Sequence, residues 1–235
     1  MKAVLTGHTR GLGAALASEL LGRGIAVLGL ARGKSGVCHS LLTEVEIDLG
    51  DTAALARWLE ADALAGFLQG AGSALLINNA GTVQPVGSLG DQDPGAVAGA
   101  VGLNVAAPLM LAAALARIAV AQRRILHISS GAGSSAYPGW SVYCATKAAL
   151  DQHARAVALD AVKGMRICSL APGVIDTGMQ AEIRATPQAR FPMRERFLEL
   201  KRSGQLVSPA DCAVGVIDYL LADRFGERPV DDLRN

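Results

Sequence analysis

Three residues in the middle of the chain have the types and the spacing of a proton-transfer site. Tyr143 and Lys147 lie four residues apart in a stretch with helical periodicity, so both side chains lie on one face of a helix. A lysine ammonium beside a phenol favours the phenolate, and we expect it to lower the pKa of the tyrosine from its usual value of about 10. Ser130, thirteen residues before the tyrosine, can hydrogen-bond a substrate oxygen. Together they predict general acid–base chemistry.

A glycine-rich loop near the start of the chain lies between a predicted strand and a predicted helix. Glycines let the backbone approach a pyrophosphate, and the free N–H groups of the following helix attract its charge. The GxxxGxG spacing also fits an ordinary tight turn, but its place directly after the first strand favours a dinucleotide site. His8 either touches phosphate there or is a solvated loop histidine. The predicted contacts are Thr6, Gly7, Thr9, Arg10, Gly11, Leu12 and Gly13.

An arginine stands at the end of the second predicted strand, where an acid would bind a ribose 2′-hydroxyl. The chain reads Leu30-Ala31-Arg32 at this point. The guanidinium of Arg32 can pair with a 2′-phosphate through its planar fork of donors, and Arg10 can add a second charge. Two solvated surface arginines are the alternative. The pattern favours NADP over NAD.

Short apolar runs alternate with helical periodicity along the chain. They predict strands at 2–6, 25–30, 45–47, 74–77, 125–129 and 165–170, and helices at 12–21, 53–64, 94–119, 142–162 and 209–221. Repeated strand–helix units imply one doubly wound α/β domain over residues 1–235, with a mainly parallel sheet and helices on both faces. Residues 177–208 interrupt this rhythm with a long polar segment, which we interpret as a substrate lid.

Composition excludes several classes of function. The net charge of +1 favours neither nucleic acid nor an anionic membrane. No uninterrupted run reaches the roughly 20 apolar residues that cross a bilayer, and the N-terminus has no signal-peptide pattern. The cysteines are scattered without metal-ligand spacing, so we expect reduced thiols, no metal site and a cytoplasmic protein. The partner that remains is a small molecule.

Five motifs follow one another at compatible spacings. They are TGxxxGxG at Thr6–Gly13, NNAG at Asn78–Gly81, Asn104, the serine before YxxxK, and Pro172-Gly173 with Thr177. Over nearly the whole chain they resemble the short-chain dehydrogenase/reductase family, in its subclass of roughly 250 residues, and within it carbonyl reductases of the sepiapterin and benzil reductase type. The resemblance implies a Rossmann-type fold and an NADPH-dependent reductase of a small ketone, diketone or aldehyde.

The resemblance also assigns roles to residues. It implies that Tyr143 protonates the carbonyl oxygen while Ser130 holds that oxygen. Lys147 also binds the nicotinamide ribose, and Asn104 holds a water that links the lysine to solvent. The further cofactor contacts that it implies are Asp48 at the adenine, Thr177 at the carboxamide, and Asn79, Ala80, Gly81, Pro172, Gly173 and Val174.

The substrate side leaves alternatives open. Trp140 either stacks on an aromatic substrate or anchors its loop, and Met179 is a second predicted substrate contact. Basic lid residues suggest an acidic carrier and hence a 3-oxoacyl reductase, although glutamates between them favour a solvated amphipathic helix. A non-catalytic NADP-binding redox regulator is the third possibility. Family members pair through two long helices, so we expect a homodimer or homotetramer. The basic lid residues are Arg184, Arg190, Arg194, Arg196, Lys201 and Arg202.

Overall fold

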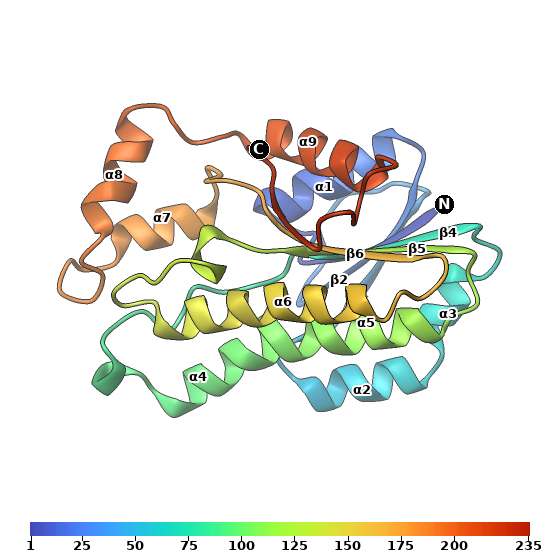
Figure 1. The fold of residues 1–235 in the computed structure, drawn as a ribbon, viewed down its shortest axis with the longest axis horizontal. Coiled ribbons are helices and arrows are strands. Elements are labelled where there is room, and N and C mark those ends of the chain that lie inside the picture. Colours follow the sequence, from blue (N-terminus) through green and yellow to red (C-terminus); the bar gives the residue numbers. More distant parts are fainter.

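The computed structural model describes residues 1–235, and its centre is a parallel sheet of seven strands in the order β3-β2-β1-β4-β5-β6-β7 (Figure 1). Every neighbouring pair of strands is parallel. This confirms the predicted doubly wound domain. The strands are β1 (Lys2–Thr6), β2 (Ala26–Ala31), β3 (Leu42–Glu46), β4 (Ser73–Asn78), β5 (Gln122–Ile128), β6 (Met165–Ala171) and β7 (Val230–Asp232).

Helices cover both faces of the sheet, which explains why the inner strands are continuous apolar runs. In Figure 1, α1 and α9 lie on one face, and α2, α4, α5 and α6 lie on the other. Two large clusters of buried apolar side chains, one on each face, pack these helices against the sheet. The helices are α1 (Gly11–Gly22), α2 (Thr52–Glu60), α3 (Ala63–Leu68), α4 (Pro94–Val101), α5 (Ala107–Arg117), α6 (Ser141–Leu159), α7 (Gly178–Ala185), α8 (Arg194–Arg202) and α9 (Pro209–Leu221).

Three elements differ from the predicted pattern. The predicted helix 53–64 is two helices, because Asp62 adopts a left-handed φ of 54° between α2 and α3. The polar lid segment is not an extended loop but contains α7 and α8, which lie to one side of the sheet in Figure 1. The short strand β7 was not predicted, since its three residues carry no readable periodicity.

The stretch from Pro94 to Arg117 is one continuous helical run that joins α4 to α5 through a π-helical segment, Gly102–Ala106. By length and composition it could cross a membrane, although no unbroken apolar run of that length was found in the sequence. In the structure its α5 part packs on β4 and β5 as a core helix, and core helices meet the same criterion.

The order in which successive strands are added to the sheet reverses between β1 and β4, although the strands themselves stay parallel. From β1 the sheet continues through β2 and β3 to one edge, and from β4 through β5, β6 and β7 to the other. The carboxyl ends of β1 and β4 therefore border the crevice where doubly wound sheets bind their ligands. Gly7 follows β1 at this point, and Asn79 follows β4.

Candidate active site

The loop between β1 and α1 is held in a shape that only glycine permits. Gly7 and Gly11 have positive φ angles of 69° and 55°. A Cβ on Gly13 would lie 1.9 Å from the carbonyl oxygen of Gly7. The turn therefore brings the start of α1 directly against the end of β1, as a pyrophosphate-binding loop requires.

Thr6 and Asn79 join the ends of β1 and β4. The Thr6 hydroxyl oxygen accepts hydrogen bonds from the backbone N–H groups of Asn79 and Ala80, both at 2.9 Å. In return, the Asn79 side-chain amide donates to the carbonyl oxygens of Thr6 at 3.0 Å and Gly7 at 3.3 Å. Asn79 thus satisfies backbone groups of the glycine loop and holds the crevice together.

The two predicted phosphate-binding arginines lie free at the surface. Arg10 and Arg32 are exposed, and neither forms an ion pair with an acid of the chain. Thr177, at the start of α7, contacts the glycine loop, since a Cβ on Gly11 would lie 3.4 Å from its methyl carbon. Asp48 is exposed after β3 and accepts a hydrogen bond from the Gly50 N–H at 2.9 Å.

The remaining predicted cofactor contacts lie around the same crevice. Thr9 is half-buried within the glycine loop, and Leu12 is a buried residue of the first turn of α1. The turn after β6 begins at Pro172 and continues through Gly173, which has a φ of 88°, to Val174. The Val174 carbonyl accepts the N–H of Val207 at 3.0 Å, so this turn is tied to the end of the lid.

His8 differs from both expectations for it. The histidine is neither solvated nor directed at a phosphate, because its side chain is fully buried and its Nε2 lies 2.7 Å from Glu44 Oε1 on β3. Room for the imidazole exists because residue 29 is glycine, and a Cβ there would lie 2.5 Å from the ring.

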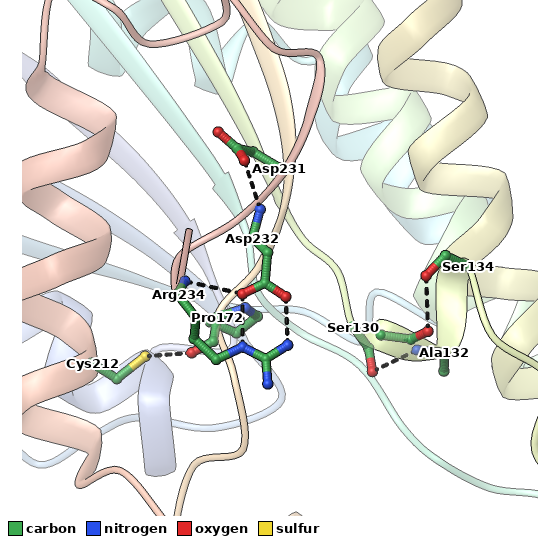
Figure 2. A network of polar contacts seen from close by, with 9 residues as sticks. Ser130, Ala132, Ser134, Pro172, Cys212, Asp231, Asp232 and Arg234 are labelled. Carbon is green, nitrogen blue, oxygen red and sulfur yellow. Dashed lines mark hydrogen bonds and ion pairs between the residues drawn. The ribbon is translucent and has the colours of Figure 1, made fainter.

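Ser130, Tyr143 and Lys147 come together as predicted. Ser130 follows β5, and its hydroxyl oxygen accepts the N–H of Ala132 at 3.2 Å (Figure 2). Tyr143 and Lys147 are both buried on α6, with the lysine Nζ 5.7 Å from the centre of the phenol ring. The Lys147 ammonium donates to the carbonyl oxygen of Ile128 at 2.7 Å, which ties α6 to the end of β5.

The expected fall in the pKa of Tyr143 is wrong for the unliganded chain. Burial raises the pKa of the phenol to about 12, and interaction with the Ser130 side chain only partly opposes this. Burial also lowers the pKa of Lys147 to about 8, against the charge of Asp151, which acts to raise it. Near neutral pH the site therefore holds a protonated phenol beside a lysine that is close to losing its proton.

Asn104 lies in the π-helical segment and faces the same site. Its amide donates to the carbonyl of Thr82 at 2.8 Å and to the hydroxyl of Thr146 at 3.1 Å, while its oxygen accepts the Thr82 N–H at 2.9 Å. A Cβ on Gly81 would lie 3.2 Å from the Asn104 oxygen and 3.9 Å from the Lys147 nitrogen. The four predicted catalytic residues and the NNAG turn thus converge at the end of the sheet, and π segments often mark functional sites.

Asp151 is a buried group of the site that the sequence interpretation missed. Its Oδ1 accepts hydrogen bonds from the hydroxyls of Ser129 and Ser169, both at 2.7 Å, and so joins α6 to β5 and β6. It lies one turn after Lys147 on the same helix, and the i,i+4 spacing of the two charges was the available signal.

An aromatic cluster closes the substrate side. Trp140 is 4% exposed and stacks on Phe191 with ring centres 4.5 Å apart, and its ring centre lies 5.3 Å from that of Tyr143. Phe197 from α8 completes the cluster, and Met179 packs against it. Of the two roles considered for Trp140, the structure favours anchoring of the loop to the lid.

Three of the six basic lid residues form ion pairs with acids in or next to the lid, and Arg190, Arg194 and Arg196 form none. The Asp176 carboxylate lies 2.5 Å from the Lys201 ammonium and 3.8 Å from the Arg184 guanidinium. The Arg202 guanidinium lies 3.1 Å from the Glu199 carboxylate. Helix α8 exposes its charges and buries Phe197, which is the amphipathic arrangement. The charge pattern of α8 is therefore that of the solvated amphipathic helix favoured from the sequence.

The C-terminus returns to the site through β7. Leu233 donates its N–H to the carbonyl of Ala171 at 2.9 Å, and Arg234 donates to both carboxylate oxygens of Asp232. Figure 2 shows this pair beside Pro172 and across from the Ser130 loop. The end of the chain therefore forms part of the rim of the crevice.

The fold and these residues define a dinucleotide-dependent α/β enzyme, and comparison with known proteins agrees. Residues 1–188 match the family model described as short chain dehydrogenase. Benzil reductase ((S)-benzoin forming) from Bacillus cereus is 31% identical over 97% of this chain and 96% of the relative. Sepiapterin reductase from Meriones unguiculatus is 32% identical over 94% of this chain and 92% of the relative. A short-chain dehydrogenase/reductase from Burkholderia vietnamiensis, known from a crystal structure, is 50% identical in sequence. The match covers 100% of this chain and 97% of that chain, with a TM-score of 0.72.

The chain belongs to the short-chain dehydrogenase family, as its motifs indicated. It is an oxidoreductase of a family that uses nicotinamide cofactors. The similarity to benzil and sepiapterin reductases spans almost the full length of both partners, so it extends well beyond the cofactor side.

Proposed function

We propose that the protein is a cytoplasmic, NADPH-dependent reductase that converts a small ketone, diketone or aldehyde to an alcohol, with Tyr143 as the general acid. The observation that carries this proposal is the buried pair of Tyr143 and Lys147 beside Ser130, at the crevice where the glycine loop ends. The relatives named benzil reductase and sepiapterin reductase support a carbonyl substrate.

The residues present fit a dinucleotide that carries a 2′-phosphate. The close approach of Gly13 to Gly7 sets the start of α1 against the end of β1, where the free N–H groups of the helix would meet a pyrophosphate. Arg10 and Arg32 are exposed and have no acidic partner, so both are available to hold the additional phosphate of NADPH.

The reaction is a reduction in which NADPH, when bound, supplies the hydride. Ser130 holds the carbonyl oxygen through its hydroxyl, which stabilises the negative charge that develops there. Tyr143 begins the step protonated, because its pKa of about 12 lies far above neutrality. It donates its hydroxyl proton to the oxygen, and the Lys147 ammonium stabilises the phenolate that remains. Asn104, fixed by Thr82 and Thr146 in the same site, would hold the water that links Lys147 to solvent.

Consumption of NADPH with a panel of carbonyl compounds tests the proposal. The panel contains benzil and other diketones, aromatic ketones, aldehydes and a thioester-linked 3-oxoacyl compound. We expect turnover with free diketones or ketones and at least tenfold less with the thioester, since the relatives are named for the reduction of free carbonyl compounds. Absence of turnover with every carbonyl, together with tight NADPH binding, would instead favour a redox regulator.

The Arg32→Asp variant tests the choice of cofactor. We expect its NADPH dissociation constant to rise about 10- to 100-fold, because a charge-assisted bidentate contact is replaced by repulsion. The NADH constant should change little, since NADH has no 2′-phosphate. Equal changes for both cofactors would show that Arg32 does not meet this phosphate.

We also propose that the chain forms a homodimer or homotetramer through the long helices. Exposed apolar side chains on α4 and at the end of α6 support this, with Val101 at 43% and Leu159 at 85% exposure. Light scattering of the purified protein measures the assembly directly, and a monomer at micromolar concentration contradicts it.

A further inference from the structure

A hydrogen bond between two side chains connects the glycine loop to the edge of the sheet. The His8 imidazole lies inside the protein between the loop and Gly29 of β2, and its Nε2 meets Glu44 Oε1 at 2.7 Å. Gly29 on β2 is paired in the sheet with Glu44 on β3. Because Gly29 has no side chain, the space beside the Glu44 carboxylate is open to the imidazole. His8 therefore reaches across β2 to an acid on the next strand.

The same carboxylate oxygen holds the segment that follows β2. Glu44 Oε1 also accepts the backbone N–H of Ser35 at 2.7 Å, and Ser35 lies three residues after Arg32. Burial acts to raise the pKa of Glu44, but the hydrogen bonds from Ser35 and His8 outweigh it and lower the pKa to about 2. An ionised acid thus joins two backbone segments that are far apart in sequence.

Residues 32–41 have little other support. This segment contains no helix or strand, and most of its side chains are exposed. Its other side-chain hydrogen bonds are local ones, from Val37 N–H to the Ser35 hydroxyl and from Leu41 N–H to His39. The end of β2 is itself held, because Leu30 accepts the N–H of Gly7 at 2.8 Å and Ala31 accepts that of Ile47 at 2.7 Å. Without Glu44 the residues from Arg32 to Ser35 would lose their link to the glycine loop beyond this point, and ordering them on binding would cost affinity.

We propose that Glu44 is a positioning residue, which fixes the Arg32–Ser35 turn against the glycine loop and thereby sets the discrimination between NADPH and NADH. The inference rests on the proposed function, because it takes Arg32 as the partner of the 2′-phosphate. Glu44 itself faces the protein, with a side chain only 13% exposed. Its role is to hold Arg32 in place, and pairing with His8 reduces the repulsion between this acid and a nearby phosphate.

An opposite role for Glu44 predicts the opposite result. If the carboxylate served as the acid that binds a ribose 2′-hydroxyl, its removal would weaken NADH binding and improve NADPH binding. The two roles are therefore distinguished by the sign of the change in the ratio of the two dissociation constants.

The test measures dissociation constants of NADPH and NADH for Glu44→Ala by calorimetry, without substrate. We expect the NADPH constant to rise about tenfold, the value of one charge-assisted hydrogen bond, and the NADH constant to stay within about twofold. Glu19→Ala is the control, since Glu19 forms an ion pair with Arg23 at 2.6 Å on the surface of α1. It should leave both constants unchanged.

A double-mutant cycle separates positioning of Arg32 from a general structural role. In an Arg32→Ala background, Glu44→Ala should have no further effect on NADPH binding, because the group that it positions is gone. A variant that does not fold is replaced by Glu44→Gln, which keeps the shape and an acceptor but loses the charge that pairs with His8. We expect an intermediate loss of NADPH affinity from it.

The outcomes distinguish this inference from the proposed function. A wild-type protein that binds NADH more tightly than NADPH overturns both. A wild-type preference for NADPH that is unchanged in Glu44→Ala, or additive effects of the two substitutions, overturns only the role of Glu44. An increased preference for NADPH in the variant assigns the opposite role to the carboxylate and also overturns this inference.

Discussion

The cofactor side and the substrate side of the crevice are held together by different forces. On the cofactor side, the geometry is set by hydrogen bonds from the side chains of Thr6 and Asn79 to backbone groups, and by the close contact of Gly13 with Gly7. On the substrate side, Trp140 and Phe191 form an apolar contact between the loop after β5 and the lid. One side depends on particular backbone conformations, and the other depends on side-chain volume.

This difference teaches which parts of the site can vary. A glycine with a positive φ is replaced only at a cost in strain, and one with a backbone atom where its Cβ would be cannot be replaced without a shift of the backbone. Buried apolar contacts, in contrast, tolerate exchanges that conserve volume. Repacking of the cluster around Trp140 is therefore expected to alter the substrate side without disturbing the cofactor side.

Tyr143→Phe addresses the point where the two sides meet and should have the largest effect. We expect the variant to lose about 10²- to 10⁴-fold in kcat, the usual contribution of a general acid, because no other proton donor replaces the hydroxyl. NADPH binding should remain close to the wild-type value. Steady-state kinetics and calorimetry measure both quantities, and a variant with full activity would show that the assigned acid is wrong.

Phe191→Ala tests the substrate side alone. Its ring is fully buried against Trp140, so its loss should lower the free energy of unfolding by about 3–5 kcal/mol and raise KM for the carbonyl substrate. The matched control is Phe225→Ala, also fully buried but in the core beneath α9. It should cost similar stability, measured by urea unfolding, without changing KM. Equal KM effects would mean that the cluster does not shape the substrate site.

Gly13→Ala tests the cofactor side in the same way. The added methyl would meet the Gly7 carbonyl oxygen at 1.9 Å, so we expect a loss of about 1–3 kcal/mol in stability and weaker NADPH binding. Gly22→Ala lies at the end of the same helix with no atom within 4 Å of the new methyl, and should be neutral or slightly stabilising. If both variants bind NADPH like wild type, the close approach is not needed for the cofactor.

The features that could be predicted from the sequence are those encoded within a short stretch of neighbouring residues. The glycine loop and the Tyr143–Lys147 pair are each contained in a few residues, so spacing alone located them. His8 was misjudged because its partner Glu44 lies 36 residues away, and no periodicity connects the two. The contact of Trp140 with Phe191 escaped for the same reason, whereas the amphipathic lid helix favoured by the local charge pattern is present as α8. The pKa of Tyr143 was predicted in the wrong direction, because burial is a property of the whole fold.

The pH dependence of the reaction tests Lys147, which links the two sides through its bond to the Ile128 carbonyl. Burial lowers its pKa to about 8, so above this pH the ammonium is lost and the phenolate left by Tyr143 loses its nearest positive charge. We expect kcat/KM for reduction to fall about tenfold per pH unit above pH 8. Tyr143 cannot cause this fall, since its own pKa is about 12.

Lys147→Arg identifies the group responsible. A guanidinium stays charged throughout the measurable range, so the variant should be less active at pH 7 because of its different shape, but its profile should be flat up to about pH 10. An alkaline fall that persists in this variant assigns the titration to another group. A wild-type profile that is already flat would mean that the charge of the lysine survives burial, and that the bound state restores its usual pKa.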